Sequence, residues 1–187
     1  MEQKILRLLN EKYPVDLIKV EAVTNEMFRC TAKDAVYFAR ITNYKNEDEQ
    51  LEEVNYTNFL YKEGLAVSPT IASLNEKIVE KIILNNKEVL TILYKSAPGV
   101  HLPRNQWNAE ILKKLGRQIG RLHRFSQKFE EIHPLKYIND WHVNEEYAFL
   151  TYIPKEETAI REIAEDVLST IKAIPKNQSN YGLLHGD

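Results

Sequence analysis

The sequence predicts an α+β fold, in which a five-stranded antiparallel sheet with one packed helix is followed by a helical region. Short runs of β-branched and aromatic residues, separated by polar turns, indicate strands in the first half. In the second half, apolar residues recur every three or four positions, as they do in amphipathic helices. The pattern changes near Pro98-Gly99, so we expect a first lobe over 1–94, a hinge over 95–100 and a second lobe over 101–187.

The composition excludes several classes of protein. The chain has 187 residues, of which 43% are hydrophobic and 28% charged, so it can bury a core. Lys and Arg number 25 against 27 Asp and Glu, and this balance gives no general attraction to nucleic acid or to an anionic membrane. Its apolar runs are too short to span a bilayer, and the N-terminus lacks the apolar centre of a signal peptide. The single cysteine, Cys30, excludes an internal disulfide framework, and we expect a cytoplasmic protein.

A helix and three strands are predicted first. The helix covers 1–13 and ends at Tyr13-Pro14, because proline disfavours helical backbone in the residue before it. Alternating apolar residues after Leu17 predict two strands joined across Thr24-Asn25-Glu26. A third strand, over 35–41, follows them.

A second helix and two further strands complete the predicted sheet. The helix covers 47–63, and Gly64 after it is a natural C-terminal cap. Strands over 77–84 and 88–94 flank Asn85-Asn86, a dipeptide that favours a tight hairpin turn.

Two amphipathic helices are predicted in the second lobe. The first is defined by steps of three or four residues through Trp107, Ile111, Leu115, Ile119 and Leu122. The second carries its apolar residues between 160 and 171 and ends before Pro175.

The last three residues, His185-Gly186-Asp187, form a short polar motif after the apolar pair Leu183-Leu184. A carboxylate at such an edge is well placed to act as a general base or as a metal ligand. The alternative for this triplet alone is a solvated terminal aspartate.

Arg40 is a cation at the end of an otherwise apolar strand. It is either a rim residue that extends its charge into water or a phosphate ligand steadied by a helix carboxylate. Glu53 shares one helical stripe with Tyr56 and Leu60, so we favour it as this partner over Glu49 and Glu52.

Several stretches, taken in order, resemble the aminoglycoside phosphotransferase and choline kinase family, a branch of the protein-kinase-like fold. They begin with Asn25 in the first hairpin and Tyr37-Phe38-Ala39-Arg40-Ile41 in the third strand. They continue with EVNYTNFLYKEGLAVSP from residue 53, LYKSAPGV from residue 93, LGRQIGRLHRFS from residue 115, and the final LLHGD.

The resemblance implies a role for each predicted site residue. Arg40 takes the place of the strand lysine that contacts the ATP phosphates, and Glu53 takes that of its ion-pair partner. Asn25 lies in the loop near the phosphates, where relatives often have glycine and where asparagine can adopt a left-handed turn. Backbone groups of Lys95 and Ala97 bond the adenine edge. Asp187 orients the acceptor hydroxyl and takes its proton as the γ-phosphoryl group moves.

The resemblance also implies a Mg²⁺ cofactor and a small-molecule acceptor. In the family, an Asn and an Asp that follow His-Gly-Asp bind the magnesium, so we expect the metal ligands beyond Asp187 and none within the chain. The acceptor hydroxyl is expected on an aminoglycoside, choline, homoserine or a related metabolite. A protein hydroxyl is a further possibility within this fold.

Because the sequence ends inside the expected catalytic loop, we expect this chain to bind nucleotide weakly and to turn over little or not at all. Apolar faces of the second lobe are expected to be uncovered and to favour self-association. The alternative function is a non-catalytic, kinase-like module that binds a nucleotide or a partner.

Overall fold

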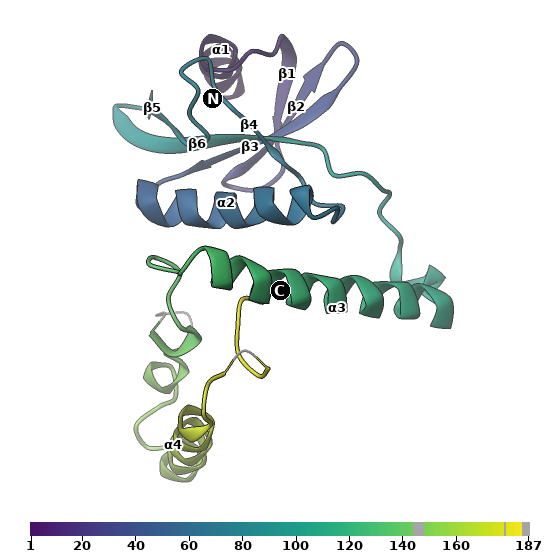
Figure 1. Cartoon of the computed structure of the whole chain (residues 1–187). Helices are drawn as coiled ribbons and strands as arrows, with labels where there is room; N and C mark the ends of the chain where they lie inside the picture. Colours follow the sequence, from purple (N-terminus) through teal and green to yellow (C-terminus); the bar gives the residue numbers. More distant parts are fainter. Residues whose placement is uncertain (144–147, 178, 185–187) are drawn as a thin grey trace.

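The computed structural model describes residues 1–143, 148–177 and 179–184, and it places two lobes one above the other (Figure 1). The first lobe contains a sheet and two helices: α1 (Glu2–Lys12), β1 (Leu17–Ala22), β2 (Met27–Ala32), β3 (Val36–Thr42), α2 (Glu47–Lys62), β4 (Thr70–Ile71), β5 (Glu80–Leu84) and β6 (Lys87–Lys95). The described helices of the second lobe are η1 (Arg104–Gln106), α3 (Ala109–Ile132), η2 (Trp141–Val143), η4 (Phe149–Thr151) and α4 (Thr158–Ala173).

The sheet is antiparallel, with the strand order β1-β2-β3-β6-β4, and β5 pairs with the first part of β6. All five predicted strands are present, and the structure adds a sixth, β4. This strand has two residues and pairs with Tyr94 and Leu93 of β6. So short a segment cannot show the alternation by which strands are predicted. Asn85 and Asn86 have φ angles of 52° and 62°, as a tight two-residue hairpin turn requires.

The two helices of the first lobe cover opposite faces of this sheet. Ile5 and Leu9 of α1 belong to a buried cluster that includes Ala39 and Leu93 of the sheet. Val54 of α2 packs on the other face, in a cluster with Val79, Leu90 and Ile92. Neighbouring strand residues such as Ile92 and Leu93 contribute to different clusters because side chains alternate between the faces of a strand.

Both ends of α2 are capped, and of the two caps the sequence analysis predicted the one at Gly64. Asn46 and Glu49 form a capping box, in which each side chain accepts a hydrogen bond from the other residue's backbone N–H. Gly64 follows the helix with a φ of 81°, a conformation that glycine adopts without strain. These signals fix where α2 begins and ends, and therefore which of its residues face the sheet.

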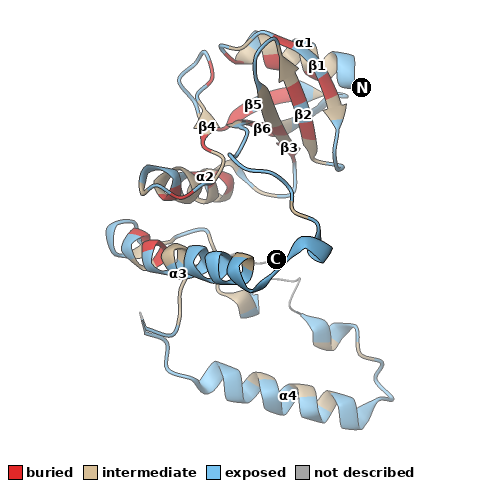
Figure 2. Ribbon diagram, turned by 90° about the vertical axis from the view of Figure 1, so that its right-hand side faces the viewer, coloured by how far each residue is buried: buried red, intermediate tan, exposed pale blue. Residues whose placement is uncertain are grey.

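The C-terminal half of α3 packs against α2, where Phe125 joins Leu60 and Leu65 in a third buried cluster. The predicted apolar stripe of α3 is only partly buried, because Leu115 and Ile119 remain exposed. Most apolar residues of α4 are exposed as well, and Figure 2 shows no buried residue along this helix. The described residues do not bury these apolar faces of α3 and α4. Among the described helices, none combines the length and the apolar character needed to cross a bilayer.

Candidate functional site

Arg40 lies on the face of the sheet that α2 covers. In the register of β3 and β6 it is opposite Ile92, which belongs to the cluster under α2. Its Nη1 atom donates to Oε1 of Glu53 over 2.7 Å. The strand cation and the helix carboxylate that the sequence suggested as partners are therefore an ion pair; their role toward a nucleotide stays a prediction.

Lys45 is a second cation at this site, and the sequence analysis missed it. Its Nζ atom donates to Oε2 of Glu53 over 2.6 Å, so each oxygen of this carboxylate has a basic partner. Tyr44 completes the group: its ring centroid lies 5.6 Å from the Arg40 guanidinium and 5.7 Å from the Lys45 ammonium. The signal that would have indicated Lys45 is its position directly before the cap of α2, between Arg40 and Glu53 in the chain.

Glu53 and Arg40 each stabilise the ionised form of the other. Burial opposes ionisation of Glu53, but the hydrogen bond from Lys45 and the charge of Arg40 outweigh it and lower the pKa of the carboxyl. Burial likewise opposes the charge of Arg40, yet the Glu53 carboxylate raises the pKa of the guanidinium. Nearby on β6, burial and the Glu53 charge raise the pKa of Tyr94 to about 12. The Glu53 carboxylate and the Arg40 guanidinium therefore both stay ionised near neutral pH.

The three acids considered as partners of Arg40 have three different environments. Glu49 belongs to the cap of α2. Glu52 faces the second lobe, where its carboxylate accepts hydrogen bonds from backbone N–H groups of residues 136–138. Only Glu53 has the helical phase that directs it to the sheet, as its stripe predicted.

The first hairpin brings Glu26, and not Asn25, toward Arg40. Oε2 of Glu26 lies 4.0 Å from Nε of Arg40, and its Oε1 accepts from the Thr42 hydroxyl over 2.9 Å. Asn25 is exposed, and positive φ angles at non-glycine positions among the described residues occur only at Glu76, Asn85 and Asn86. The left-handed turn considered for Asn25 is thus not formed, because Thr24 stabilises the loop by accepting from the N–H groups of Glu26 and Met27.

Lys95 and Ala97 lie where the hinge was predicted, and both are exposed. Lys95 is the last residue of β6, and its N–H donates to the Pro69 carbonyl over 2.8 Å. Of the backbone groups of Lys95, only the carbonyl is therefore a candidate for contact with adenine.

Asp187, the predicted base, lies outside the described residues, as does the rest of the His-Gly-Asp motif. The segment that leads to it is attached to α3, since the Leu183 N–H donates to Oε1 of Glu130 over 2.7 Å. The described residues contain no group of three or more His, Cys, Asp or Glu side chains that would bind a metal ion. The expectation that Mg²⁺ ligands come from outside this chain stays a prediction.

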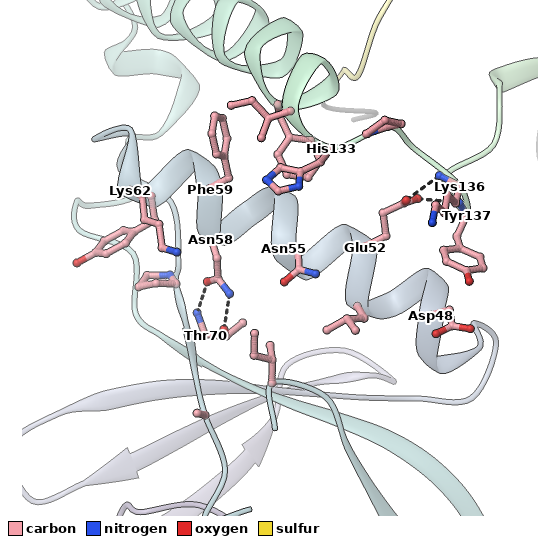
Figure 3. Close-up of a pocket in the computed structure, with 18 of the residues that line it drawn as sticks. Asp48, Glu52, Asn55, Asn58, Phe59, Lys62, Thr70, His133, Lys136 and Tyr137 are labelled. Carbon is pink, nitrogen blue, oxygen red and sulfur yellow. Dashed lines mark hydrogen bonds between the residues drawn. The ribbon is translucent and has the colours of Figure 1, made fainter. Parts of the chain in front are cut away.

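A pocket of about 910 Å³ lies beside α2, on the side of the helix away from Glu53 (Figure 3). Glu52, Asn55 and Asn58 line it from the helix, and His133 lines it from the segment after α3. Lys95 is the one predicted site residue in its lining. This pocket is therefore distinct from the Arg40–Glu53 pair.

The chain is similar to known phosphotransferases in sequence. The model of the phosphotransferase enzyme family matches residues 18–187, which confirms the family resemblance. Over 166 residues the chain is 26% identical to an amicoumacin kinase of Bacillus subtilis (strain 168), covering 87% of this chain and 49% of that protein. The chain thus spans about half the length of this curated relative.

Solved structures of other kinases share its fold. An amicoumacin kinase, hAmiN, in complex with AMP-PNP, Ca²⁺ and Ami matches with a TM-score of 0.83 and 23% identity, covering 100% of this chain and 58% of that one. A microcompartment-associated aminopropanol kinase matches with a TM-score of 0.73 and 15% identity, covering 98% of this chain and 62% of that one. These matches confirm the predicted α+β, kinase-like fold.

Proposed function

Because the chain belongs to the phosphotransferase enzyme family, we propose that it is the nucleotide-binding part of an ATP-dependent small-molecule kinase. The observation that carries the proposal is the ion pair between Arg40 and Glu53, joined by Lys45 on the second carboxylate oxygen. A strand cation fixed by a helix carboxylate is the arrangement with which kinases grip nucleotide phosphates.

In this proposal Arg40 and Lys45 bind the phosphates of ATP, and Glu53 orients both cations. A guanidinium offers five N–H donors in one plane, so Arg40 can donate to Glu53 and Tyr44 and still offer further donors to the phosphates. Asn25 and the rest of the first hairpin loop lie above the phosphates. The carbonyl of Lys95 and the backbone of Ala97 meet the adenine edge, as the family resemblance implies.

The proposed reaction moves the γ-phosphoryl group to an alcohol. The acceptor oxygen forms a bond to the γ-phosphorus while the bond between that phosphorus and the leaving oxygen of ADP breaks, and the hydroxyl proton passes to the Asp187 carboxylate. Magnesium is the metal we expect with ATP, where it neutralises phosphate charge, with its protein ligands outside this chain. The chain without them is expected to turn over little or not at all.

The acceptor we propose is a small molecule that carries a hydroxyl and an amino or quaternary ammonium group. The support is the similarity to an amicoumacin kinase and to an aminopropanol kinase, together with the family's aminoglycoside and choline substrates. A cytoplasmic location belongs to the same proposal, since it fits the use of ATP and the free thiol of Cys30.

Calorimetric titration of ATP into this chain, with and without Mg²⁺, tests the nucleotide site. Arg40→Ala is expected to weaken ATP binding about tenfold or more, because it removes charge-assisted contacts. Arg29→Ala is the matched control, since Arg29 is an exposed arginine on the neighbouring strand β2. A folded chain that binds no ATP, or an equal loss in both variants, would refute the proposed site.

An assay for ADP release, with aminopropanol or amicoumacin as acceptor, tests the reaction. Binding of ATP without turnover is the expected result for the 187-residue chain. This result would also fit the alternative of a non-catalytic module. The same assay is therefore run on a longer form of the protein that turns over, with and without the substitution Asp187→Asn. Turnover that survives this substitution would contradict the role of Asp187 as the base.

A further inference from the structure

We propose that Glu52 is a positioning residue, which fixes α2 against the second lobe and thereby keeps Glu53 directed at Arg40. The inference rests on the proposed function, because it concerns how the phosphate-binding cation is oriented. Glu52 itself lies on a different side of the helix and does not contact the Arg40 site.

The observation behind this proposal is the environment of the Glu52 carboxylate. Its Oε1 atom accepts from the Lys136 N–H over 2.7 Å, and its Oε2 accepts from the N–H groups of Tyr137 and Ile138 over 2.8 and 2.5 Å. Figure 3 shows this carboxylate reaching from α2 to the segment that follows α3. Three successive backbone N–H groups around one anion form a concave binding site, and hydrogen bonds to a charged acceptor are stronger than those between neutral groups.

The contact fixes the rotation of α2 and not only its distance from the second lobe. Adjacent residues of an α-helix point about 100° apart, so Glu52 and Glu53 mark two sides of the same turn. One carboxylate is bound by the second lobe and the other by β3 and Lys45. A rotation of α2 that breaks the first contact also moves Glu53 away from Arg40.

A second contact on the same helix supports this geometry. The Tyr56 hydroxyl lies 2.5 Å from the Ser126 hydroxyl, and the Tyr56 ring packs on Phe129 of α3 at a centroid distance of 5.2 Å. At the end of α2, the ion pair between Glu63 and Lys128 is open to solvent on the Lys128 side, so it contributes less. Among these interlobe contacts, the Glu52 site is the one built from a charged acceptor and three backbone donors.

The first test measures the Arg40 side chain without nucleotide. The NMR signal of the Arg40 Nε–H group is recorded in the parent chain, in Glu53→Gln, which lacks the ion pair, and in Glu52→Gln. We expect Glu52→Gln to move this signal toward its position in Glu53→Gln. Asp48→Asn is the matched control, because it removes one charge from an exposed position on the same helix, and it should leave the signal unchanged.

The second test measures ATP affinity in a double-mutant cycle. Glu52→Gln is expected to weaken ATP binding about fivefold in the parent background and much less in the Glu53→Gln background, since the effect passes through Glu53. A loss of general stability would weaken binding equally in both backgrounds. Glu52→Asp keeps the charge and shortens the side chain, and it replaces Glu52→Gln in both tests if the latter is unfolded by circular dichroism.

The outcomes separate this inference from the proposed function. An Arg40 signal that is the same in the parent and in the Glu52 variant overturns the inference, and so does an equal loss of ATP affinity in both backgrounds. A signal that moves as expected in a chain that binds no ATP supports the role of Glu52 and refutes the proposed nucleotide site.

Discussion

Glu53 is the residue on which the charge arrangement of the site depends. It is the common partner of Arg40 and Lys45, and its pKa is lowered because these two cations outweigh the effect of burial. Without this carboxylate, two cations would face each other across a partly buried space. The site is therefore expected to respond to pH through Glu53.

Replacing Glu53 by Gln is expected to lower the free energy of unfolding by about 1 kcal/mol at pH 7. The pKa of Glu53 in the folded state is below its ordinary value of 4.5, so the stabilisation is complete above pH 4.5 and is lost as the pH falls below it. Urea unfolding of parent and variant at neutral and at acid pH measures the difference. Glu162→Gln, at an exposed position of α4, is the control, and a difference that stays the same in acid would contradict the prediction.

Gln50 differs from Glu53, because no described contact offsets the cost of burying its polar side chain. It is fully buried on the face of α2 that meets the sheet, and neither its Nε2 nor its Oε1 has a hydrogen-bond partner among the described residues. Gln50→Met keeps the shape and removes the unpaired amide, so it should raise the free energy of unfolding by about 1 kcal/mol. The same change at the exposed Gln3 is the control for thermal unfolding. Destabilisation by Gln50→Met would show that the amide is satisfied in solution.

Helix α2 is the element that connects the two lobes to the site. One side packs on the sheet through Val54, another contacts α3 through Tyr56, and the side away from Glu53 lines the pocket in Figure 3. Helix α2 has few apolar residues because several of its sides make polar contacts, and such a helix cannot present a single apolar stripe.

The contact between α2 and α3 depends on Phe129. This ring is buried and lies 5.2 Å from the ring centroids of both Tyr56 and Phe59. Phe129→Ala should cost about 3 kcal/mol of unfolding free energy, because it leaves a cavity between the helices. Ile132→Ala, at an exposed position one turn later, should cost far less. Equal losses in denaturant unfolding would mean that α3 is not anchored by this ring.

The molecule as a whole has a compact first lobe and a second lobe with open apolar faces. Leu115 and Ile119 of α3 are 43% and 46% exposed, and Ile163 of α4 is 65% exposed. Exposed apolar patches of this kind are typical of interfaces or of surfaces that associate.

We therefore expect the chain to self-associate at about micromolar concentration. Sedimentation velocity over a concentration series should show a mass above that of one chain in the parent and closer to one chain in Leu115→Lys with Ile119→Lys. Gln118→Lys, at an exposed polar position of the same helix, adds charge without removing an apolar side chain and should behave as the parent does. A monomer at every concentration would contradict the prediction.

Local patterns in the sequence predicted the hairpins and the end of α2 at Gly64, and they favoured Glu53 among the three acids considered as partners of Arg40. Turn residues such as Asn85-Asn86, the glycine that follows a helix and the phase of a helix act within a few residues of the chain, so they can be recognised without the fold. Lys45 was missed although it lies directly before α2, whereas the contacts of Glu52 could not be recognised in this way. Glu52 meets backbone groups 84 to 86 residues away, and the segment that provides them has no sequence signature, because a backbone N–H is the same in every residue but proline. The sequence determines the angle between two side chains on a helix, but the packing of α2 between the sheet and α3 sets the rotation of the whole helix, and that packing decided that Glu52 meets the second lobe.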